Sequence, residues 1–236
     1  MQELTSSRQA RTPRGQHESK RPPGRPRDER SRVAILRSTL KLLRKHGFAD
    51  LSIEAIAADA QVGKATVYRW WPNKGALVVD AFASNIEDEL HFPDSGSLHQ
   101  DMSVQMNQFL EVLRSRSGRI VAGVIAAGQS DPQLMEEFRA RFLRRRRHEA
   151  YQTLQRGIDR GELPQDVDLD LVLDLLYGGI YMRFLIRHDE LNERYVNNVC
   201  RVILQGVSCG TNGHGKKPLP KRQNAAIRAA LRPSRN

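Results

Sequence analysis

Residues 52–77 read SIEAIAADAQVGKATVYRWWPNKGAL, and they contain the clearest structural signals in the N-terminal part of the chain. Ser52 is a typical N-cap residue, because its side-chain oxygen can accept a hydrogen bond from a backbone N–H of the first helical turn. A short helix follows, and Gln61-Val62-Gly63 then break the helical pattern. A second short helix runs over Lys64–Trp71, and Pro72 limits its continuation. The stretch therefore predicts two short helices joined by a tight turn.

One further helix precedes this pair. Apolar residues recur at helical spacing over residues 33–43, and the helix is expected to end at Gly47, since glycine suits a left-handed C-terminal position. Three helices within about 45 residues, with a tight turn between the second and the third, describe a helix-turn-helix unit. In such a unit the third helix enters the major groove of DNA. We therefore expect DNA binding, with the motif at residues 52–71.

The second helix of the motif carries the chemical groups that DNA contacts need. Its cationic and hydrogen-bonding side chains are Lys64, Thr66, Tyr68 and Arg69. Val67 and Trp71 lie four positions apart, so both can face the core of the domain. Lys74 begins the next helix, from which its ammonium group can reach a phosphate.

The positive charge of the chain is concentrated at its two ends. The 236 residues include 38 Lys and Arg against 27 Asp and Glu, a formal net charge of +11. Residues 1–32 hold nine basic and four acidic side chains, and residues 210–236 hold seven basic and none acidic. The 177 residues between them are nearly neutral, with 22 basic and 23 acidic side chains. Such an excess indicates a polyanionic partner.

We expect residues 1–26 and 210–236 to be disordered basic tails, because they contain too few large apolar residues to form a core. Residues 24–26, Gly-Arg-Pro, resemble the core of an AT-hook that places Arg in a narrow minor groove. A solubilising tail is the alternative interpretation of this segment.

Several classes of protein are excluded by composition. The longest apolar run, Val121–Ala127, is far shorter than the roughly 20 residues of a membrane helix. The N-terminus is basic and polar and lacks the apolar region of a secretory signal. Two cysteines, Cys200 and Cys209, cannot build a disulfide framework and fit a reducing compartment. We expect a soluble, cytoplasmic protein without a membrane partner.

The remainder of the chain also has helical periodicity. After a loop at residues 91–97, the apolar spacing predicts further helices at 98–116, 119–127, 132–160, 168–187 and 192–207. Asp131-Pro132 supports one of these boundaries, since it combines an N-cap residue with proline at the first helical position. No segment outside these helices alternates as a strand does. The sequence predicts an all-α fold.

The motif resembles the DNA-binding segment of TetR-type transcriptional regulators. The resemblance covers residues 29–89 and depends on Thr-x-Tyr at 66–68, aromatic-Pro-Asn-Lys at 71–74 and Ala-Leu at 76–77. It implies a three-helix DNA-binding domain at residues 29–89, followed by a helical ligand-binding and dimerisation domain at 91–209. It also implies a homodimer on a pseudo-palindromic, double-stranded operator, and repression that a small-molecule effector relieves.

The resemblance also implies roles for individual residues. Base edges would be read by Lys64, Ala65 and Thr66. Phosphates would be contacted by Ser52, Tyr68, Trp70 and Lys74, which position the domain without reading sequence. Arg69 completes the predicted DNA-binding set, at a position that varies in the family.

Two residues depart from the family pattern. Gly63 replaces the usual hydroxyl residue at the N-cap of the recognition helix, and Trp70 replaces a frequent His or Tyr. A place in the small core is the alternative for Tyr68 and Trp70. Trp71 occupies the position of a buried Phe, so it is predicted to belong to the core.

Residues 91–209 resemble the family's C-terminal domain in helix order and length. The resemblance implies a dimer interface on the last two helices, formed by Tyr177, Gly178, Tyr181, Phe184, Val199 and Ile203. A ligand contact or a helix bend is the alternative role of the glycines at 178–179. The candidate ligand pocket consists of Met102, Met106, Phe109, Leu113, Val124, Phe138, Phe142 and Tyr177, for which a hydrophobic core is the alternative.

This pocket set contains no charged residue, which favours an apolar effector. Arg144–Arg147 is a run of four cations that covers all faces of a helix, so some of their stems must pack beside apolar surface. An additional site for DNA or an anionic ligand is an alternative role for this run.

Enzymatic and metal-binding functions find little support. Asp166, Asp168 and Asp170 resemble the start of a calcium loop, but the required Gly and Glu are absent at the sixth and twelfth positions. Asp168 as a helix N-cap explains the pattern better. We therefore predict no catalytic residues, metal or cofactor. The alternative function is a non-specific, architectural DNA-binding protein that uses its basic tails.

Overall fold

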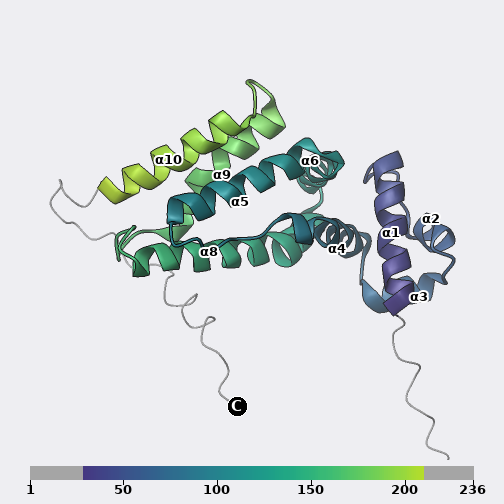
Figure 1. Ribbon diagram of the computed structural model, residues 1–236. Coiled ribbons are helices and arrows are strands. Elements are labelled where there is room, and N and C mark those ends of the chain that lie inside the picture. Colours follow the sequence, from purple (N-terminus) through teal and green to yellow (C-terminus); the bar gives the residue numbers. More distant parts are fainter. Residues whose placement is uncertain (1–28, 210–236) are drawn as a thin grey trace, which may run out of the picture.

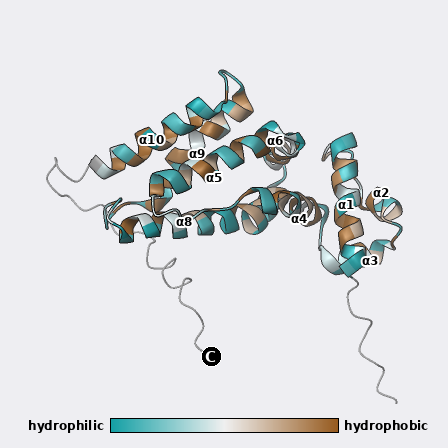
Figure 2. Ribbon diagram, viewed as in Figure 1, coloured by the Kyte–Doolittle hydropathy of each residue, from teal (hydrophilic) through white to brown (hydrophobic). Residues whose placement is uncertain are grey.

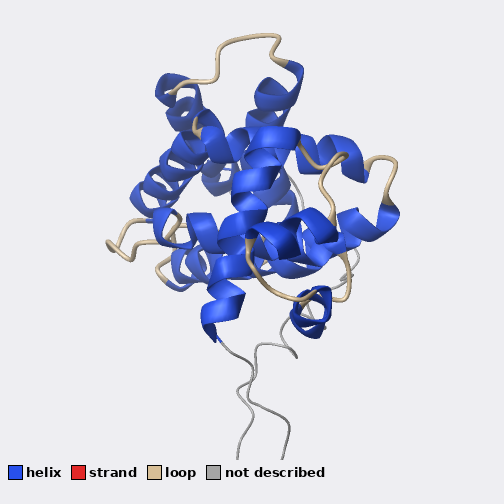
Figure 3. Ribbon diagram, turned by 90° about the vertical axis from the view of Figure 1, so that its right-hand side faces the viewer, coloured by secondary structure: helices blue, strands red, loops and turns tan. Residues whose placement is uncertain are grey.

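The computed structural model describes residues 29–209, and within this range every regular element is helical (Figures 1 and 3). The all-α prediction is therefore confirmed. The predicted basic tails, with the Gly-Arg-Pro segment, lie outside the described residues. None of the described helices is both long and apolar enough to cross a membrane.

The first three helices form a small unit at one end of the molecule (Figure 1): α1 (Glu29–His46), α2 (Ile53–Asp59) and α3 (Lys64–Trp70). Their apolar faces meet in a core that includes Ile35, Ile56, Val67 and Trp71, each at most 1% exposed. Gly47 ends α1 with φ +77°, the left-handed conformation expected from the sequence. The predicted helix-turn-helix unit is thus present.

Helix α4 (Lys74–Ile86) connects this unit to the rest of the chain and is followed by the short 3-10 helix η1 (Glu87–Glu89). It packs against α1 on one side and against α7 and the segment that follows α7 on the other. Residues on both sides of α4 are therefore buried, including Val78, Val79 and Phe82, and Figure 2 shows mainly hydrophobic colours along it. The helix is a structural bridge between the two parts of the protein.

The larger part is a helical domain. Its elements are α5 (Leu98–Arg114), α6 (Arg116–Gly128), α7 (Pro132–Phe138), η2 (Arg139–Leu143), α8 (Arg144–Asp159), α9 (Leu169–Ile186) and α10 (Glu193–Cys209). Helix α5 packs against α6, α8 and α10, and α9 lies against α8 and α10. Side chains of Ser97, Ser115, Asp131 and Asp168 cap four of these helices.

The predicted continuous helix at 132–160 is interrupted at one place. Residues Arg139–Leu143 form η2, a π-helical segment between α7 and α8. A π turn adds a residue to the helical repeat and so rotates the side chains that follow it. Such segments often occur at functional sites. Here the segment lies against α4.

Candidate nucleic-acid interface and internal cavity

The turn between α2 and α3 is built from local hydrogen bonds. Ser52 caps α2, since its Oγ accepts from the backbone N–H of Ala55 at 3.1 Å. Gln61 adopts a left-handed conformation with φ 54°, and the N–H of Val62 donates to the carbonyl of Ala57 at 2.9 Å. Gly63 is the N-cap of α3 and has no capping side chain. These contacts fix the orientation of α3 relative to α2.

Helix α3 has one buried and one open side. Val67 and, just beyond the helix, Trp71 are fully buried, as the spacing predicted. Lys64, Ala65 and Arg69 are exposed, and Tyr68 is 46% exposed, so Tyr68 is not a core residue. Thr66 and Trp70 are half-buried. The predicted DNA-binding residues of α3 therefore include a continuous group, Lys64 and Ala65, that is open to solvent.

Lys64 is paired with an acidic residue of the same motif. Its Nζ donates to Oε1 of Glu54 on α2, and it lies 5.8 Å from the centre of the Tyr68 ring. The hydrogen bond from Lys64 lowers the pKa of Glu54, and the same bond raises the pKa of Lys64. The pair is exposed, so another negative group can replace Glu54 as the partner of Lys64.

Trp70 and Lys74 pack beside α1 and the loop after it. Trp70 packs against the core, and the Arg32 guanidinium lies 5.8 Å from the centre of its ring. Lys74 Nζ donates to the carbonyl of Phe48 at 3.0 Å and lies 4.3 Å from the centre of the Phe48 ring. Two of the four predicted phosphate contacts, Trp70 and Lys74, are therefore held in place by α1 or by the loop that follows it.

A chain of polar contacts joins the end of α3 to the helical domain. Trp71 Nε1 donates to Oδ2 of Asp80 on α4 at 2.8 Å, and Arg141 Nη1 of η2 donates to the same oxygen at 3.2 Å. Arg141 Nε also donates to Oε2 of Glu137 at 2.6 Å. The other carboxylate oxygen of Glu137 accepts from Asn73 Nδ2 at 2.9 Å, and Asn73 caps α4. The Asp80 carboxylate thus accepts hydrogen bonds from both Trp71 and Arg141, and the Glu137 carboxylate accepts from both Arg141 and Asn73. These two carboxylates connect the end of α3 and the start of α4 to η2 of the helical domain.

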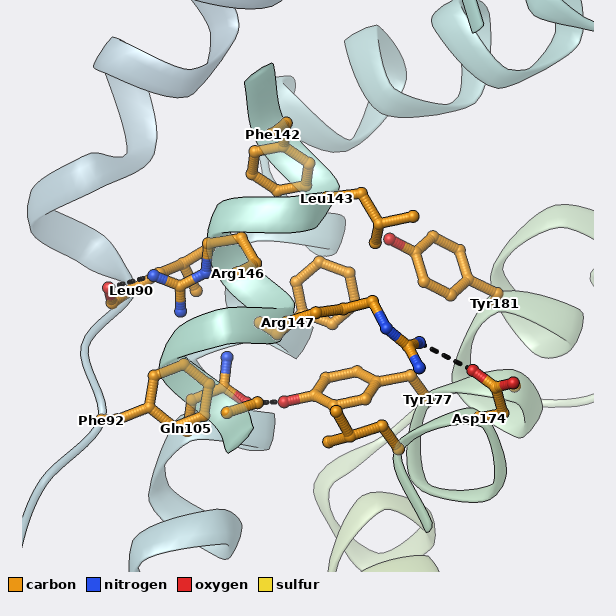
Figure 4. A pocket seen from close by; sticks show the side chains of 14 residues that line it. Leu90, Phe92, Gln105, Phe142, Leu143, Arg146, Arg147, Asp174, Tyr177 and Tyr181 are labelled. Atoms are coloured by element: carbon orange, nitrogen blue, oxygen red, sulfur yellow. Dashed lines mark hydrogen bonds and ion pairs between the residues drawn. The ribbon is translucent and has the colours of Figure 1, made fainter. Parts of the chain in front are cut away.

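The π-helical segment also borders a cavity of the helical domain that is partly open to solvent. The cavity has a volume of about 340 Å³, and Phe142 and Leu143 of η2 form part of its wall (Figure 4). Phe142 packs edge-on against Phe82 of α4, with ring centres 5.1 Å apart. Residues 141–143 therefore contact both the cavity and the helix that carries the DNA-binding unit.

Three of the eight predicted pocket residues line this cavity: Phe109, Phe142 and Tyr177. The other five are buried in the core and do not line it: Met102, Met106, Leu113, Val124 and Phe138. For these five, the alternative of a hydrophobic core is the one that the structure supports. Apolar periodicity predicted their burial but not which buried residues surround an empty space.

The cavity wall also contains charged groups, which corrects the expectation of an uncharged pocket. Arg146 and Arg147 of α8 and Asp174 of α9 line it. Arg147 extends between Tyr181 and Tyr177 toward Asp174, whose Oδ1 accepts from Nη1 at 2.7 Å (Figure 4). Arg147 also pairs with Asp170, and although burial opposes the shift, these hydrogen bonds raise its pKa.

The predicted dimer-interface residues do not share one exposed face. Tyr177 and Tyr181 point into the domain, where their ring centres lie 5.8 and 5.6 Å from that of Phe109. Phe184, Val199 and Ile203 are half-buried against the core, and Gly178 is exposed at the edge of the cavity. Of the predicted residues on α9, only Gly178 lies on the open, apolar face of the helix, where Leu171, Leu175, Met182 and Ile186 are exposed.

Both parts of the chain match models of known protein families. Residues 35–81 match the model of the bacterial regulatory proteins of the tetR family, and residues 92–203 match that of the tetracyclin repressor-like C-terminal domain. YdeS, an uncharacterized HTH-type transcriptional regulator of Bacillus subtilis strain 168, is 42% identical over 184 residues, which make up 78% of this chain and 93% of YdeS. The chain belongs to the TetR family of transcriptional regulators.

Two further relatives agree with this assignment. The DNA-binding transcriptional repressor TetR of Mycobacteroides abscessus is 26% identical over 185 residues, covering 76% of this chain and 96% of that protein. The crystal structure of the TetR-family regulator SCO0332 superposes with a TM-score of 0.67 at 34% identity, covering 75% and 98% of the two chains. This TetR-family chain is therefore a DNA-binding transcriptional regulator and not an enzyme.

Two of the three aspartates that resemble a calcium loop have structural roles. Asp168 caps α9 by accepting from the backbone N–H of Leu171 at 3.1 Å, as predicted, and Asp170 pairs with Arg147. Among residues 29–209, no three His, Cys, Asp or Glu side chains are grouped in a way that could hold a metal ion.

Some residues that connect the two domains or line the cavity were not identified from the sequence. Asp80 and Arg141 link the two domains, and Gln105 lines the cavity. Polar residues within amphipathic helices usually face solvent, so periodicity gave no signal for them. The run Arg144–Arg147 was a visible signal, but only the fold shows that its last two members reach the cavity.

Proposed function

We propose that this regulator is a homodimeric repressor that is released from a pseudo-palindromic operator when a small molecule enters the cavity. The observation that carries the proposal is the continuous path of contacts from the cavity to the recognition helix. Phe142 lines the cavity, Arg141 precedes it on the same π turn, and Arg141 shares Asp80 with Trp71 at the end of α3. A ligand that moves η2 would therefore displace a group that positions α3.

For DNA binding, we propose that Lys64, Ala65 and Thr66 read base edges, and that Arg69 contributes a cation beside them. Ser52, Tyr68, Trp70 and Lys74 would contact phosphates. Lys64 would exchange Glu54 for a DNA acceptor, because the Lys64–Glu54 pair is exposed and such pairs are weak. Lys74 and Trp70 are already held by neighbouring residues, which reduces the entropy lost when they contact DNA.

For the dimer, we propose the open apolar face of α9. Leu171, Leu175, Met182 and Ile186 recur at spacings of four, seven and four residues, which places them on one side of the helix. A contiguous apolar surface of this kind commonly marks a protein interface. In a two-fold dimer the two α3 helices would meet half-sites about one helical turn of DNA apart.

Release requires that the ligand binds the two arrangements of the dimer with different affinities. An effector can weaken DNA binding only by its preference for the arrangement that does not fit the operator. Couplings of this kind are typically about 5- to 150-fold in affinity. Repression is consistent with the activity of the Mycobacteroides abscessus relative, which is named as a transcriptional repressor.

A binding titration tests this function against the architectural alternative. The full chain and a chain of residues 29–209 are titrated by fluorescence anisotropy onto duplexes from the DNA next to the gene, and onto shuffled duplexes, at two salt concentrations. We expect the shorter chain to keep its preference for one site and to lose mainly salt-dependent affinity. Loss of all preference on removing the tails would support the architectural alternative instead.

A further inference from the structure

The cavity wall contains one hydroxyl group that the described part of the chain leaves unused. It belongs to Tyr181 of α9, whose ring packs against that of Phe109 with ring centres 5.6 Å apart. Figure 4 shows this hydroxyl directed into the cavity, toward Leu143 of η2. Among residues 29–209 it has no hydrogen-bond partner. Polar groups of this kind, in a mainly apolar wall, orient the ligands of such cavities.

The Tyr181 hydroxyl also keeps surface that a ligand can reach. Within residues 29–209, four polar side-chain atoms are both fully enclosed and without a hydrogen-bond partner: Asp101 Oδ2, Asn107 Oδ1, Arg146 Nη2 and Arg156 Nε. The oxygen of Tyr181 lacks a partner but is not one of these four atoms, so it is not fully enclosed. Tyr181 is half-buried and lines the cavity, and its open hydroxyl therefore faces the space that a ligand would occupy.

The second tyrosine hydroxyl of the wall is already used. Tyr177, one helical turn before Tyr181 on α9, donates to Oε1 of Gln105 on α5 (Figure 4). Burial raises the pKa of Tyr181 to about 12, so its hydroxyl keeps its proton at neutral pH. The Tyr181 hydroxyl therefore lacks an acceptor for this proton.

The charges around the cavity are already balanced. Arg146 is paired with Glu149, and Arg147 is paired with both Asp170 and Asp174. An anionic ligand would therefore meet no cation of the wall without a carboxylate partner. It would also lie near Asp174, which itself lines the cavity. This arrangement favours an uncharged ligand.

The rest of the wall is mainly aromatic and aliphatic. Five rings line the cavity: Phe92, Phe109, Phe142, Tyr177 and Tyr181. Aromatic rings pack favourably with one another in edge-on and offset arrangements. The volume of about 340 Å³ is roughly twice that of an engineered apolar cavity of about 150 Å³ that holds benzene, which suits two or three rings. A carbonyl group supplies an acceptor without adding a donor that such a wall would leave unpaired.

We propose that the effector is an uncharged aromatic molecule of two or three rings whose carbonyl oxygen accepts a hydrogen bond from the Tyr181 hydroxyl. This inference rests on the proposed ligand-released function, and it names the class of ligand for the same cavity. Because the hydroxyl is directed toward Leu143, the bound carbonyl would lie beside η2, the segment that also carries Arg141. The ligand would thus be anchored next to the contact between Arg141 and Asp80.

Three probes that share one ring system test the proposal: 9-fluorenone, which has a carbonyl; fluorene, which has no acceptor; and fluorene-9-carboxylate, which is an anion. The affinity of the full-length protein for each probe is measured by equilibrium dialysis. The variant is Tyr181→Phe, which removes the hydroxyl and keeps the ring. Tyr195→Phe is the matched control, since Tyr195 is a half-buried tyrosine of α10 that does not line the cavity.

We expect 9-fluorenone to bind about three- to tenfold more tightly than fluorene, which is the effect of one hydrogen bond between uncharged groups. Fluorene-9-carboxylate should bind more weakly than 9-fluorenone. Tyr181→Phe should abolish the preference for 9-fluorenone over fluorene, whereas Tyr195→Phe should retain it. Fluorene binding to Tyr181→Phe also shows that this variant has folded, and circular dichroism provides a second check.

Equal binding of 9-fluorenone and fluorene to the unaltered protein would overturn the proposal, as would tighter binding of the carboxylate or no binding of any probe. A preference that survives in Tyr181→Phe, or that is also lost in Tyr195→Phe, would overturn the role of the Tyr181 hydroxyl.

A parallel anisotropy experiment separates this result from the proposed function. If 9-fluorenone binds through Tyr181 but does not release the protein from its preferred DNA, the ligand class stands and ligand-controlled release fails. If the protein has no preferred DNA site, equilibrium dialysis still decides the ligand class.

Discussion

Replacing Arg141 by Met should weaken the connection between the helical domain and the DNA-binding unit. Arg141 donates to Glu137 at 2.6 Å and to Asp80 at 3.2 Å, and its side chain is 31% exposed. Methionine keeps most of the stem and removes both charge-assisted hydrogen bonds. The hydrogen bond from Trp71 Nε1 to Asp80 Oδ2 would remain.

The size of the effect follows from the burial of the two bonds. A hydrogen bond to a charged group contributes about 1.5–3 kcal/mol when it is buried, and partial exposure reduces this to about 1 kcal/mol for each bond here. The free energy of unfolding should therefore fall by about 2 kcal/mol. With a urea m-value of about 2–3 kcal/mol per molar, the midpoint should fall by about 0.7–1 M at a fixed protein concentration.

Arg139→Met is the matched control. Arg139 lies on the same π segment and pairs with Glu136, but about half of each side chain is exposed. We expect no measurable shift of the urea midpoint for this variant, since exposed pairs contribute little. Equal shifts for the two variants, or no shift for Arg141→Met, would refute the structural role assigned to Arg141.

Three further predictions follow from other contacts. Glu54→Gln should raise DNA affinity about two- to fivefold, because it releases Lys64 from its ion pair. Asp59→Asn removes the same charge from α2 but not the partner of Lys64, so it should change DNA affinity less. Equal effects of the two substitutions in fluorescence anisotropy would contradict this. Leu175→Arg should convert the dimer to a monomer in light scattering, and an unchanged mass would exclude the α9 interface. Burial raises the pKa of Tyr181 to about 12. The stability that Tyr181 contributes should therefore be complete below about pH 10 and be lost toward pH 12, and Tyr181→Phe should weaken this dependence in urea titrations.

The fold could be predicted from the sequence because its local signals agree with one another. Ser52 and Asp168 are N-caps, Gly47 ends α1 in a left-handed conformation, and Val67 and Trp71 are buried at the predicted spacing. Each of these features depends on neighbours within a few residues. The family resemblance added the order of the domains, and the comparisons confirm it.

The cavity and the contacts between domains could not be predicted in the same way. The spacing of Met102 and Phe142 is equally compatible with a filled core and a cavity wall, and only the packing of distant helices separates them. The π turn at 139–143 adds one residue to a helical turn and so rotates the side chains that follow it. This added residue cannot be recognised in the amphipathic pattern of the sequence. Arg146 and Arg147 line the cavity, although their sequence neighbours Arg144 and Arg145 are exposed.

In the proposed function, α3 of each subunit of a two-fold dimer reads one half of a preferred DNA site. Hydroxyl-radical footprinting of the full-length protein on the DNA next to its gene tests this most directly. We expect two protected half-sites whose centres lie about one helical turn, roughly 34–36 Å, apart, and whose protection is lost in a Lys64→Ala, Thr66→Ala variant. Uniform, salt-sensitive protection without a preferred site, unchanged in the variant, would contradict it.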